Sequence, residues 1–590
     1  MNKLSFFICI FLGLTLFSCN EEKWLKEEPL DFNSPEFSYE TTANFKQAVN
    51  FMFDILRYYH FTYADHGFQN LFYIGGDLYY SGWPDNLDDA FNCFHPYINS
   101  TQDDVQKNWS LFYNVVSKAN DILGRLETNA SMVPEADKLT FKGEALFFRA
   151  YYYRLLAHIW GDVPLVTEML TAPTVDFTRN PRDEVYAQCQ ADLEEAARLL
   201  GDIEKVADGA INKQVAQHLL AEIYICRGNY TKAIEAATTV INHPAMGLMT
   251  ERFGTVKDQP GDVFWDLFRG GNQNRKPSGN TESLLVIQFD YLNGSPYECM
   301  LPRFITPQLR LVSILKKGMT NINDPTHRVN AFPDFTKEDG GRGNGYFAST
   351  HHFKRTIWGL KKEDDRQTQN ISERTSDIRT SKYNICRDWR IDNVNAEGWG
   401  QWVVQDRWLR DVDTFAQCFP CITKFNAYDA LPDPSYQLNK NTGVRDLTSL
   451  GKHILVNSGN SAHGSFKDEY LIRLSETYLL LAEAYVRNNQ PALAADAINV
   501  VRSRAKASPA SAAEMNIDYI LDERLRELAG EEMRNVTLFR MGKFVERARK
   551  YNPAGYHVAD WQNLYPIPYS EIEKNTKGTL TQNPGYAAGD

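Results

Sequence analysis

The chain has 590 residues, of which 43% are hydrophobic and 23% are charged, a composition that fits a globular protein and excludes a disordered one. A formal net charge of −12 gives no support to binding of the nucleic-acid phosphate backbone. The mean hydropathy of −0.45 excludes a polytopic membrane protein. Aromatic residues reach 13%, which leaves a surplus of rings beyond the needs of an average core.

The N-terminus has the pattern of a secretory signal. The basic residue Lys3 precedes the apolar run 4–17, which is too short to span a bilayer but suits the hydrophobic part of a signal peptide. The run ends at Leu16-Phe17-Ser18-Cys19, which resembles a bacterial lipobox, so residues 1–18 are expected to be removed and Cys19 to be acylated. An ordinary signal peptide with an incidental cysteine is the alternative.

The residues that follow Cys19 bear on localisation. Asn20-Glu21-Glu22-Lys23 resembles the acidic stretch that sends lipoproteins of one bacterial phylum to the outer face of the outer membrane. We therefore expect a lipid-anchored protein of the outer membrane that is exposed at the cell surface.

A distant internal repeat indicates a helical scaffold. Residues 219–240 and 480–501 share small, aromatic and aliphatic positions at a constant offset, with Tyr224 matching Tyr485. A small residue three positions before each Tyr, and Gly or Asn four positions after it, is the tetratricopeptide (TPR) spacing of two closely packed antiparallel helices. Further amphipathic helices are expected at about 103–126, 137–160, 181–200 and 518–529. The predicted fold is mainly α, a TPR-like helical-repeat scaffold of about four helix pairs with long loop-rich insertions that carry short strands.

Two irregular stretches interrupt the helical pattern. The longer one, about 244–463, is dense in Gly, Asn, Asp and Pro and carries short strand-like runs such as 284–289. The shorter one covers 61–100. Because functional surfaces usually lie on loops that a rigid frame holds, a ligand is to be sought in these two stretches.

The cysteines do not define a function. Removal of Cys9 with the signal and acylation of Cys19 leave seven, an odd number that cannot all pair. Cys418 and Cys421 have the spacing of a redox pair or of half a zinc site, but a second pair for zinc is missing. Structural or disulfide-linked cysteines are favoured over redox chemistry.

Blocks of sequence from residue 143 to residue 586 resemble the SusD/RagB family of surface nutrient-binding lipoproteins. The blocks, in the family's order, are 143–153 with 160–165, 181–186 with 192–193, 470–484, 499–505, 523–532, 566–568 and 582–586. The charged residues of 523–534 also lie at spacings that allow ion pairs along a helix, so these motifs are interpreted as carrying the fold.

The resemblance implies a domain organisation and a role. The signal 1–18 is followed by one SusD-like domain, 19–590, with a TPR-like N-terminal half at about 19–243, the loop-rich insertion at about 244–463 and a C-terminal half at about 464–590. The family's role implies a protein that captures an oligosaccharide or polysaccharide and delivers it, as a lid, to a SusC-like TonB-dependent outer-membrane transporter. A RagB-like peptide binder is the alternative within the family.

An enzyme, in particular a carbohydrate-active one, is the competing class. The sequence holds no H-E-x-x-H, no P-loop and no G-x-S-x-G elbow. The adjacent His351 and His352 are interpreted as loop surface, and the glycines of 340–345 lack the spacing of a nucleotide loop. We therefore expect no catalytic residues, no metal and no cofactor.

Aromatic residues in the irregular stretches are the candidate ligand-binding residues, because Trp and Tyr stack on the flat faces of sugars while amides and carboxylates bind the hydroxyl rim. Trp83-Pro84-Asp85-Asn86 resembles the Trp-x-x-Asn with which the starch-binding founder of the family presents a ring and an amide to sugar. The candidates are Trp83, Asn86, Tyr79, Tyr80, Asp85, Trp358, Trp389, Trp399 and Trp402. Packing within the loop-rich insertion is the alternative for each Trp of that segment.

Overall fold

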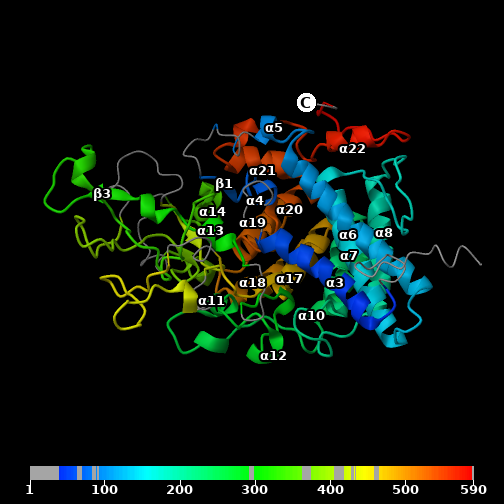
Figure 1. Cartoon of the computed structure of the whole chain (residues 1–590), viewed down its shortest axis with the longest axis horizontal. Helices are drawn as coiled ribbons and strands as arrows, with labels where there is room; N and C mark the ends of the chain where they lie inside the picture. Colours follow the sequence, from blue (N-terminus) through cyan, green and yellow to red (C-terminus); the bar gives the residue numbers. More distant parts are fainter. Residues whose placement is uncertain are drawn as a thin grey trace, which may run out of the picture.

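The structure is a computed structural model of the whole chain. It describes residues 39–62, 70–82, 88, 92, 94–291, 298–361, 374–403, 418–426, 431, 433–456 and 464–587. Long helices form one side of the molecule, and segments with short strands and turns form the other (Figure 1). None of the helices in these residues combines the length and the apolar character needed to cross a bilayer.

A stack of antiparallel helices forms the frame. Its N-terminal members are α3 (Thr42–Arg57), α6 (Asp103–Thr128), α7 (Glu135–Trp160), α8 (Arg182–Leu199), α9 (Lys213–Cys226) and α10 (Tyr230–Ile241). Its C-terminal members are α17 (Leu474–Arg487), α18 (Pro491–Arg504), α19 (Ile517–Leu528), α20 (Arg534–Arg540), α21 (Phe544–Tyr551) and α22 (Tyr569–Lys574). From α6 to α10 each helix packs on the next, and α10 packs on α17, so the two halves form one stack. The predicted mainly α, helical-repeat scaffold is confirmed.

The two copies of the predicted repeat are the pairs α9–α10 and α17–α18. In the first pair Ala221, Ala233 and Ala237 are fully buried, as expected of small residues that let two helices approach. The turn between the helices contains Gly228 with a φ of 71° in the first pair and Asn489 with a φ of 61° in the second. Gly and Asn are the residues that tolerate this left-handed backbone, which explains why one or the other occupies this position.

The described residues between α10 and β8 are here called the loop-rich lobe. Short strands of the lobe form antiparallel pairs with each other, with β8 and with one strand of the shorter irregular stretch. The pairs are β1 (Tyr79–Ser81) with β5 (Phe347–Ser349), β2 (Ser283–Ile287) with β8 (Glu469–Arg473), β3 (Ser313–Leu315) with β4 (Arg328–Asn330), and β6 (Ile385–Cys386) with β7 (Cys421–Ile422). The lobe also contains the short helices α11 (Val263–Leu267), α12 (Arg275–Ser278), α13 (Leu301–Ile305) and α14 (His351–Lys354), while α4 (Asn70–Tyr73) and α5 (Phe94–Tyr97) lie in the shorter irregular stretch. Strand β8 continues directly into α17, which joins the lobe to the stack.

A buried network of ion pairs fastens the lobe to the stack. Arg379 of the lobe donates to Glu523 of α19 over 2.8 Å, and Glu282 beside β2 accepts from Arg473 over 2.5 Å. Glu527 of α19 contacts Arg379, Arg473 and Arg504. The charged motif of α19 therefore forms mainly long-range ion pairs. The pair of Arg526 with Glu523 is the one in this network that follows the predicted spacing along the helix.

The six described cysteines after Cys93 are free thiols. Cys418 and Cys421 are buried, and burial raises the pKa of both thiols. A thiol with a raised pKa is a poor nucleophile, which agrees with a structural role for this pair.

Candidate ligand-binding site

Four of the candidate aromatic residues have side chains buried in the core: Tyr79, Tyr80, Trp358 and Trp389. Tyr79 and Tyr80 lie in β1 with buried side chains, and the ring of Tyr79 stacks on Phe347 with the centroids 5.4 Å apart. The side chain of Trp358 is also buried, and its indole N–H donates to the carbonyl of Phe353 over 2.6 Å. Trp83, Asp85 and Asn86 lie outside the described residues.

Trp389 and Trp402 meet in one cavity of the lobe. Backbone pairing of residues 389–391 with 401–403 brings them together, with the N–H of Val403 donating to the carbonyl of Trp389 over 2.8 Å. The cavity has a volume of about 360 Å³. Its lining, here called the aromatic pocket, consists of Trp265, Glu338, Asp339, Lys382, Tyr383, Cys386, Asp388, Trp389, Arg390, Trp402, Thr423 and Lys452. Trp399 lies outside this lining, is 45% exposed and donates its indole N–H to Ser449.

A capped helix and a turn place the other two rings of the pocket. Asp262 caps the start of α11 by accepting the backbone N–H of Trp265 over 2.9 Å. The same carboxylate accepts hydrogen bonds from Ser381 and Asn384, which anchors the turn that carries Tyr383. The rings of Trp265 and Tyr383 consequently lie 6.0 Å apart between centroids.

Asp388 gives the pocket a carboxyl group with unusual electrostatics. It is only 4% exposed, and one of its oxygens accepts the backbone N–H of Trp389 over 2.8 Å. Within the described part of the chain no cation forms an ion pair with it. Burial raises the pKa of Asp388 to about 7, although the hydrogen bond from Trp389 opposes this shift. Near neutral pH this group is therefore able to donate or to accept a hydrogen bond.

Charged groups at the edge of the pocket are mostly paired with each other. Lys452 bridges the carboxylates of Asp339 and Asp392, each over 2.8 Å. Glu338 pairs with His453 over 2.7 Å. The pocket thus combines aromatic walls with fixed polar groups, which is the usual composition of a small-molecule site.

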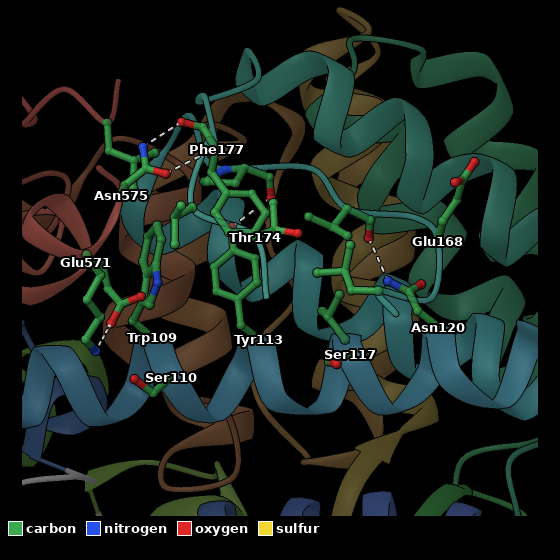
Figure 2. A pocket seen from close by; sticks show the side chains of 17 residues that line it. Trp109, Ser110, Tyr113, Ser117, Asn120, Glu168, Thr174, Phe177, Glu571 and Asn575 are labelled. Atoms are coloured by element: carbon green, nitrogen blue, oxygen red, sulfur yellow. Dashed lines mark hydrogen bonds and ion pairs between the residues drawn. The ribbon is translucent and has the colours of Figure 1, made fainter. Parts of the chain in front are cut away.

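A second and larger cavity, here called the α6 groove, lies over the helical stack. Its volume is about 610 Å³, and Trp109 and Tyr113 rise from α6 toward Phe177 on the opposite wall (Figure 2). Asn575 holds this wall by accepting the N–H of Phe177 over 2.7 Å and donating to its carbonyl over 2.8 Å. Trp109 packs against Tyr113 and Trp160, with centroids 5.0 and 5.3 Å apart, so the rings of this groove serve first to pack the helices.

One group of side chains of the type that binds metals occurs among the described residues. Asp202, Glu204 and His243 bring ligand atoms within 4.8 Å of one another near the surface. His243 already pairs with Asp202 over 3.0 Å, and Gln214 donates to the same carboxylate. The group is consistent with a local surface network.

Sequence reasoning missed Trp265, Tyr383 and Asp388 as members of the pocket. Trp265 and Asp388 are separated by more than a hundred positions, and only the packing of α11 against the turn before β6 brings them together. A single sequence carries no signal for such a contact.

Comparison with known proteins defines the family. The profile of the SusD family matches residues 285–586, and a profile described as "Starch-binding associating with outer membrane" matches residues 30–225. The chain belongs to the SusD family, as the sequence blocks indicated.

Relatives of known name support this assignment. The chain is 22% identical to SusD-like protein P25 of Formosa agariphila over 98% of this chain and 97% of that protein. It is 33% identical to the starch-binding protein SusD of Bacteroides thetaiotaomicron over 21% of this chain and 23% of that protein.

Solved structures show the same fold. A laminarin-binding SusD-like protein superimposes with a TM-score of 0.60 at 21% identity, covering 93% of this chain and all of that one. Surface glycan-binding protein A from Bacteroides fluxus gives a TM-score of 0.60 at 21% identity with the same coverage. The mainly helical, TPR-like architecture of this chain is that of SusD-like proteins.

Proposed function

We propose that this protein binds a glycan and that the aromatic pocket is part of its binding site. The observation that carries the proposal is that Trp265, Trp389 and Trp402 line one cavity together with the buried Asp388. Aromatic faces bind the C–H faces of sugar rings, and a carboxyl that both donates and accepts hydrogen bonds suits hydroxyl groups. The glycan-binding relatives named above support the ligand class.

The remaining candidates are proposed to extend the site. Trp83, Asp85 and Asn86 follow β1 closely, and the N–H of Gly82 at the end of β1 donates to the carbonyl of Tyr346 over 3.0 Å. Trp399 at the tip of the paired segment is a candidate for a longer ligand.

We further propose the cellular setting that the family implies. The protein is anchored at the outer membrane through a lipid on Cys19, after removal of residues 1–18, and faces the cell exterior. It delivers an oligosaccharide to a SusC-like TonB-dependent transporter, for which it acts as a lid. The outer-membrane description of the matching N-terminal profile and the lipobox support this setting. We also propose that residues 19–590 form one mature domain.

Calorimetry with a panel of neutral glycans, acidic glycans and peptides tests the proposed function. Trp402→Ala is expected to weaken binding of a recognised glycan at least tenfold, because truncating an aromatic anchor at the centre of a binding site costs about 2 kcal/mol or more and tenfold corresponds to about 1.4 kcal/mol. Trp561→Ala is the control, since Trp561 is 39% exposed and belongs to the C-terminal segment. Equal glycan affinity of the wild type and Trp402→Ala contradicts the pocket as the site.

Two other results of the same panel contradict the proposal as a whole. Binding of peptides without binding of any glycan favours the RagB-like alternative. Release of shorter products during prolonged incubation of a bound glycan shows an enzyme, whereas we propose binding without turnover.

A further inference from the structure

The glycine-rich segment 340–345 makes a close backbone contact that brings arginine residues together. Its backbone runs against α13 and the residues after it, with the N–H of Asn344 donating to the carbonyl of Arg303 over 2.8 Å and that of Gly345 to Thr306 over 3.0 Å. A Cβ atom at Gly343 would lie 2.3 Å from the carbonyl oxygens of Thr306 and Pro307. Only glycine permits this approach, and the approach brings Arg342 into the neighbourhood of Arg303.

Three arginines gather at this contact. Arg303 lies in α13, Arg310 in the following turn and Arg342 in the glycine-rich segment; together they are here called the arginine cluster. The guanidinium carbons of Arg310 and Arg342 each lie 5.6 Å from the ring centroid of Phe335, so the two side chains share one aromatic ring.

The electrostatic effects of these charges on one another agree with the contacts to Phe335 and along the backbone. Burial and the charge of Arg342 lower the pKa of Arg303, while burial and the charge of Arg310 lower the pKa of Arg342. Like charges at this separation cost free energy unless an anion offsets them. The buried arginines of the α19 network differ from Arg303 and Arg310, because each of them contacts carboxylates.

The described residues supply little counter-charge to Arg303 and Arg310. Among the described residues no ion pair involves Arg303 or Arg310, and Nε of Arg303 is buried without a hydrogen-bond partner. Glu298 is the carboxyl whose charge acts on Arg303, but burial raises the pKa of Glu298 to about 7, so it is only partly ionised near neutral pH. A positive cluster therefore persists in a chain whose net charge is −12.

We propose that the arginine cluster binds the acidic group of an anionic saccharide, a carboxylate or a sulfate. The planar guanidinium group matches both oxyanions through paired N–H donors, and an anion at this place offsets the repulsion among the three arginines. The saccharide part of this inference rests on the proposed glycan-binding function, whereas the anion site itself stands on the cluster alone. A chain with an overall negative charge would otherwise repel such a ligand.

Matched pairs of oligosaccharides test the ligand class by calorimetry. One pair is a carrageenan oligosaccharide and its desulfated form, and the other is a galacturonate trimer and its methyl ester. The wild type is expected to bind the acidic member of at least one pair at least tenfold more tightly, and the pair concerned distinguishes sulfate from carboxylate. Equal binding of both members in both pairs overturns the proposal.

Variants locate the preference on the cluster. The double variant Arg303→Gln with Arg342→Gln, and separately the single variant Arg310→Gln, are expected to reduce the preference at least fivefold. Arg310 is exposed, so its replacement leaves the packing of the lobe unchanged even if the double variant does not fold. The control is Arg445→Gln, because Arg445 also lies over a ring, 3.8 Å from the centroid of Tyr436, but pairs with Asp433. An undiminished preference in Arg310→Gln overturns the assignment.

A measurement without glycans separates this inference from the proposed function. Melting temperatures are compared in sodium sulfate and in sodium chloride of equal ionic strength, for the wild type, Arg310→Gln and Arg445→Gln. Sulfate stabilises proteins in general because it is excluded from their surface, so all three proteins are expected to melt at a higher temperature in sulfate. A specific anion site predicts that this increase in melting temperature is larger for the wild type and for Arg445→Gln than for Arg310→Gln. If no glycan binds but this larger increase is present, the glycan function fails and the anion site stands. An equal increase in all three proteins overturns the anion site.

Discussion

Asp388 illustrates how a single buried group sets the properties of the pocket. Its carboxyl is surrounded by the aromatic pocket, accepts one backbone hydrogen bond and has a pKa of about 7. An ordinary Asp titrates near 4, so folding makes this residue hold its proton across a range in which the unfolded chain has lost it. Between these two pKa values the stability of the fold falls as pH rises, because the unfolded chain releases this proton while the folded protein still holds it.

Replacement of this residue by its amide tests the argument. We expect Asp388→Asn to raise the free energy of unfolding at pH 8 by about 1 kcal/mol or more relative to the wild type, and to have a smaller effect at pH 5. The amide oxygen still accepts the N–H of Trp389, while the charge that burial penalises at high pH is gone. Urea unfolding at the two pH values measures the difference. A change that is the same at pH 5 and pH 8 contradicts the raised pKa.

At the scale of elements, the helices were predictable and the lobe was not. The four helices expected outside the repeats begin and end within a few residues of α6, α7, α8 and α19. In α6 and α19 the apolar residues recur at helical spacing, whereas most of α7 is buried on all sides. The strands of the lobe have only two to five residues, and except for β3 with β4 their partners lie far away in sequence, so local patterns do not identify them. Trp389 and Trp402 were predicted from their residue type, but their contact with Trp265 depends on this long-range packing.

The turn of the repeat provides a test at the same scale. Gly228 has a φ of 71°, and a Cβ atom placed there would meet no atom within 4 Å, so any cost of a side chain comes from the backbone alone. Gly228→Ala is expected to lower the free energy of unfolding by about 1–2 kcal/mol.

Thermal or urea unfolding measures this cost against a second glycine. Gly247 lies outside the left-handed region, and its nearest contact would be 3.6 Å away, so Gly247→Ala is expected to change stability by less than ~0.5 kcal/mol. Equal effects of the two substitutions show that the left-handed turn is not what fixes glycine at position 228.

At the scale of the whole molecule, the charged motif of α19 joins the two parts that the sequence separates. Spacing predicted ion pairs along the helix, whereas Glu523 and Glu527 contact arginines of the lobe, of β8 and of α18. Residues such as Arg379 lie over a hundred positions away, and their pairing with α19 leaves no trace in local periodicity. The network is fully buried, so each charge depends on its partners for the solvation that water no longer supplies.

Removal of one charge from this network is expected to loosen the lobe from the stack. Glu527 is fully buried and contacts Arg379, Arg473 and Arg504, so Glu527→Gln leaves three arginines short of one negative charge. We expect a loss of about 3–5 kcal/mol in the free energy of unfolding, measured with urea. The exposed pair of Arg549 with Asp560 gives the control, since Asp560→Asn is expected to cost less than ~1 kcal/mol.

Limited proteolysis of Glu527→Gln identifies which part of the molecule loses stability. Because Arg379 belongs to the lobe and Glu527 to α19, cleavage of Glu527→Gln is expected to begin within the described lobe, while α6 to α10 remain protected. A loss below ~1 kcal/mol, or first cleavage within α6 to α10, contradicts a role of the network in holding the two parts together. If the lobe does loosen, glycan affinity is expected to fall with it, because the rings of the aromatic pocket are positioned only by the packing of the lobe.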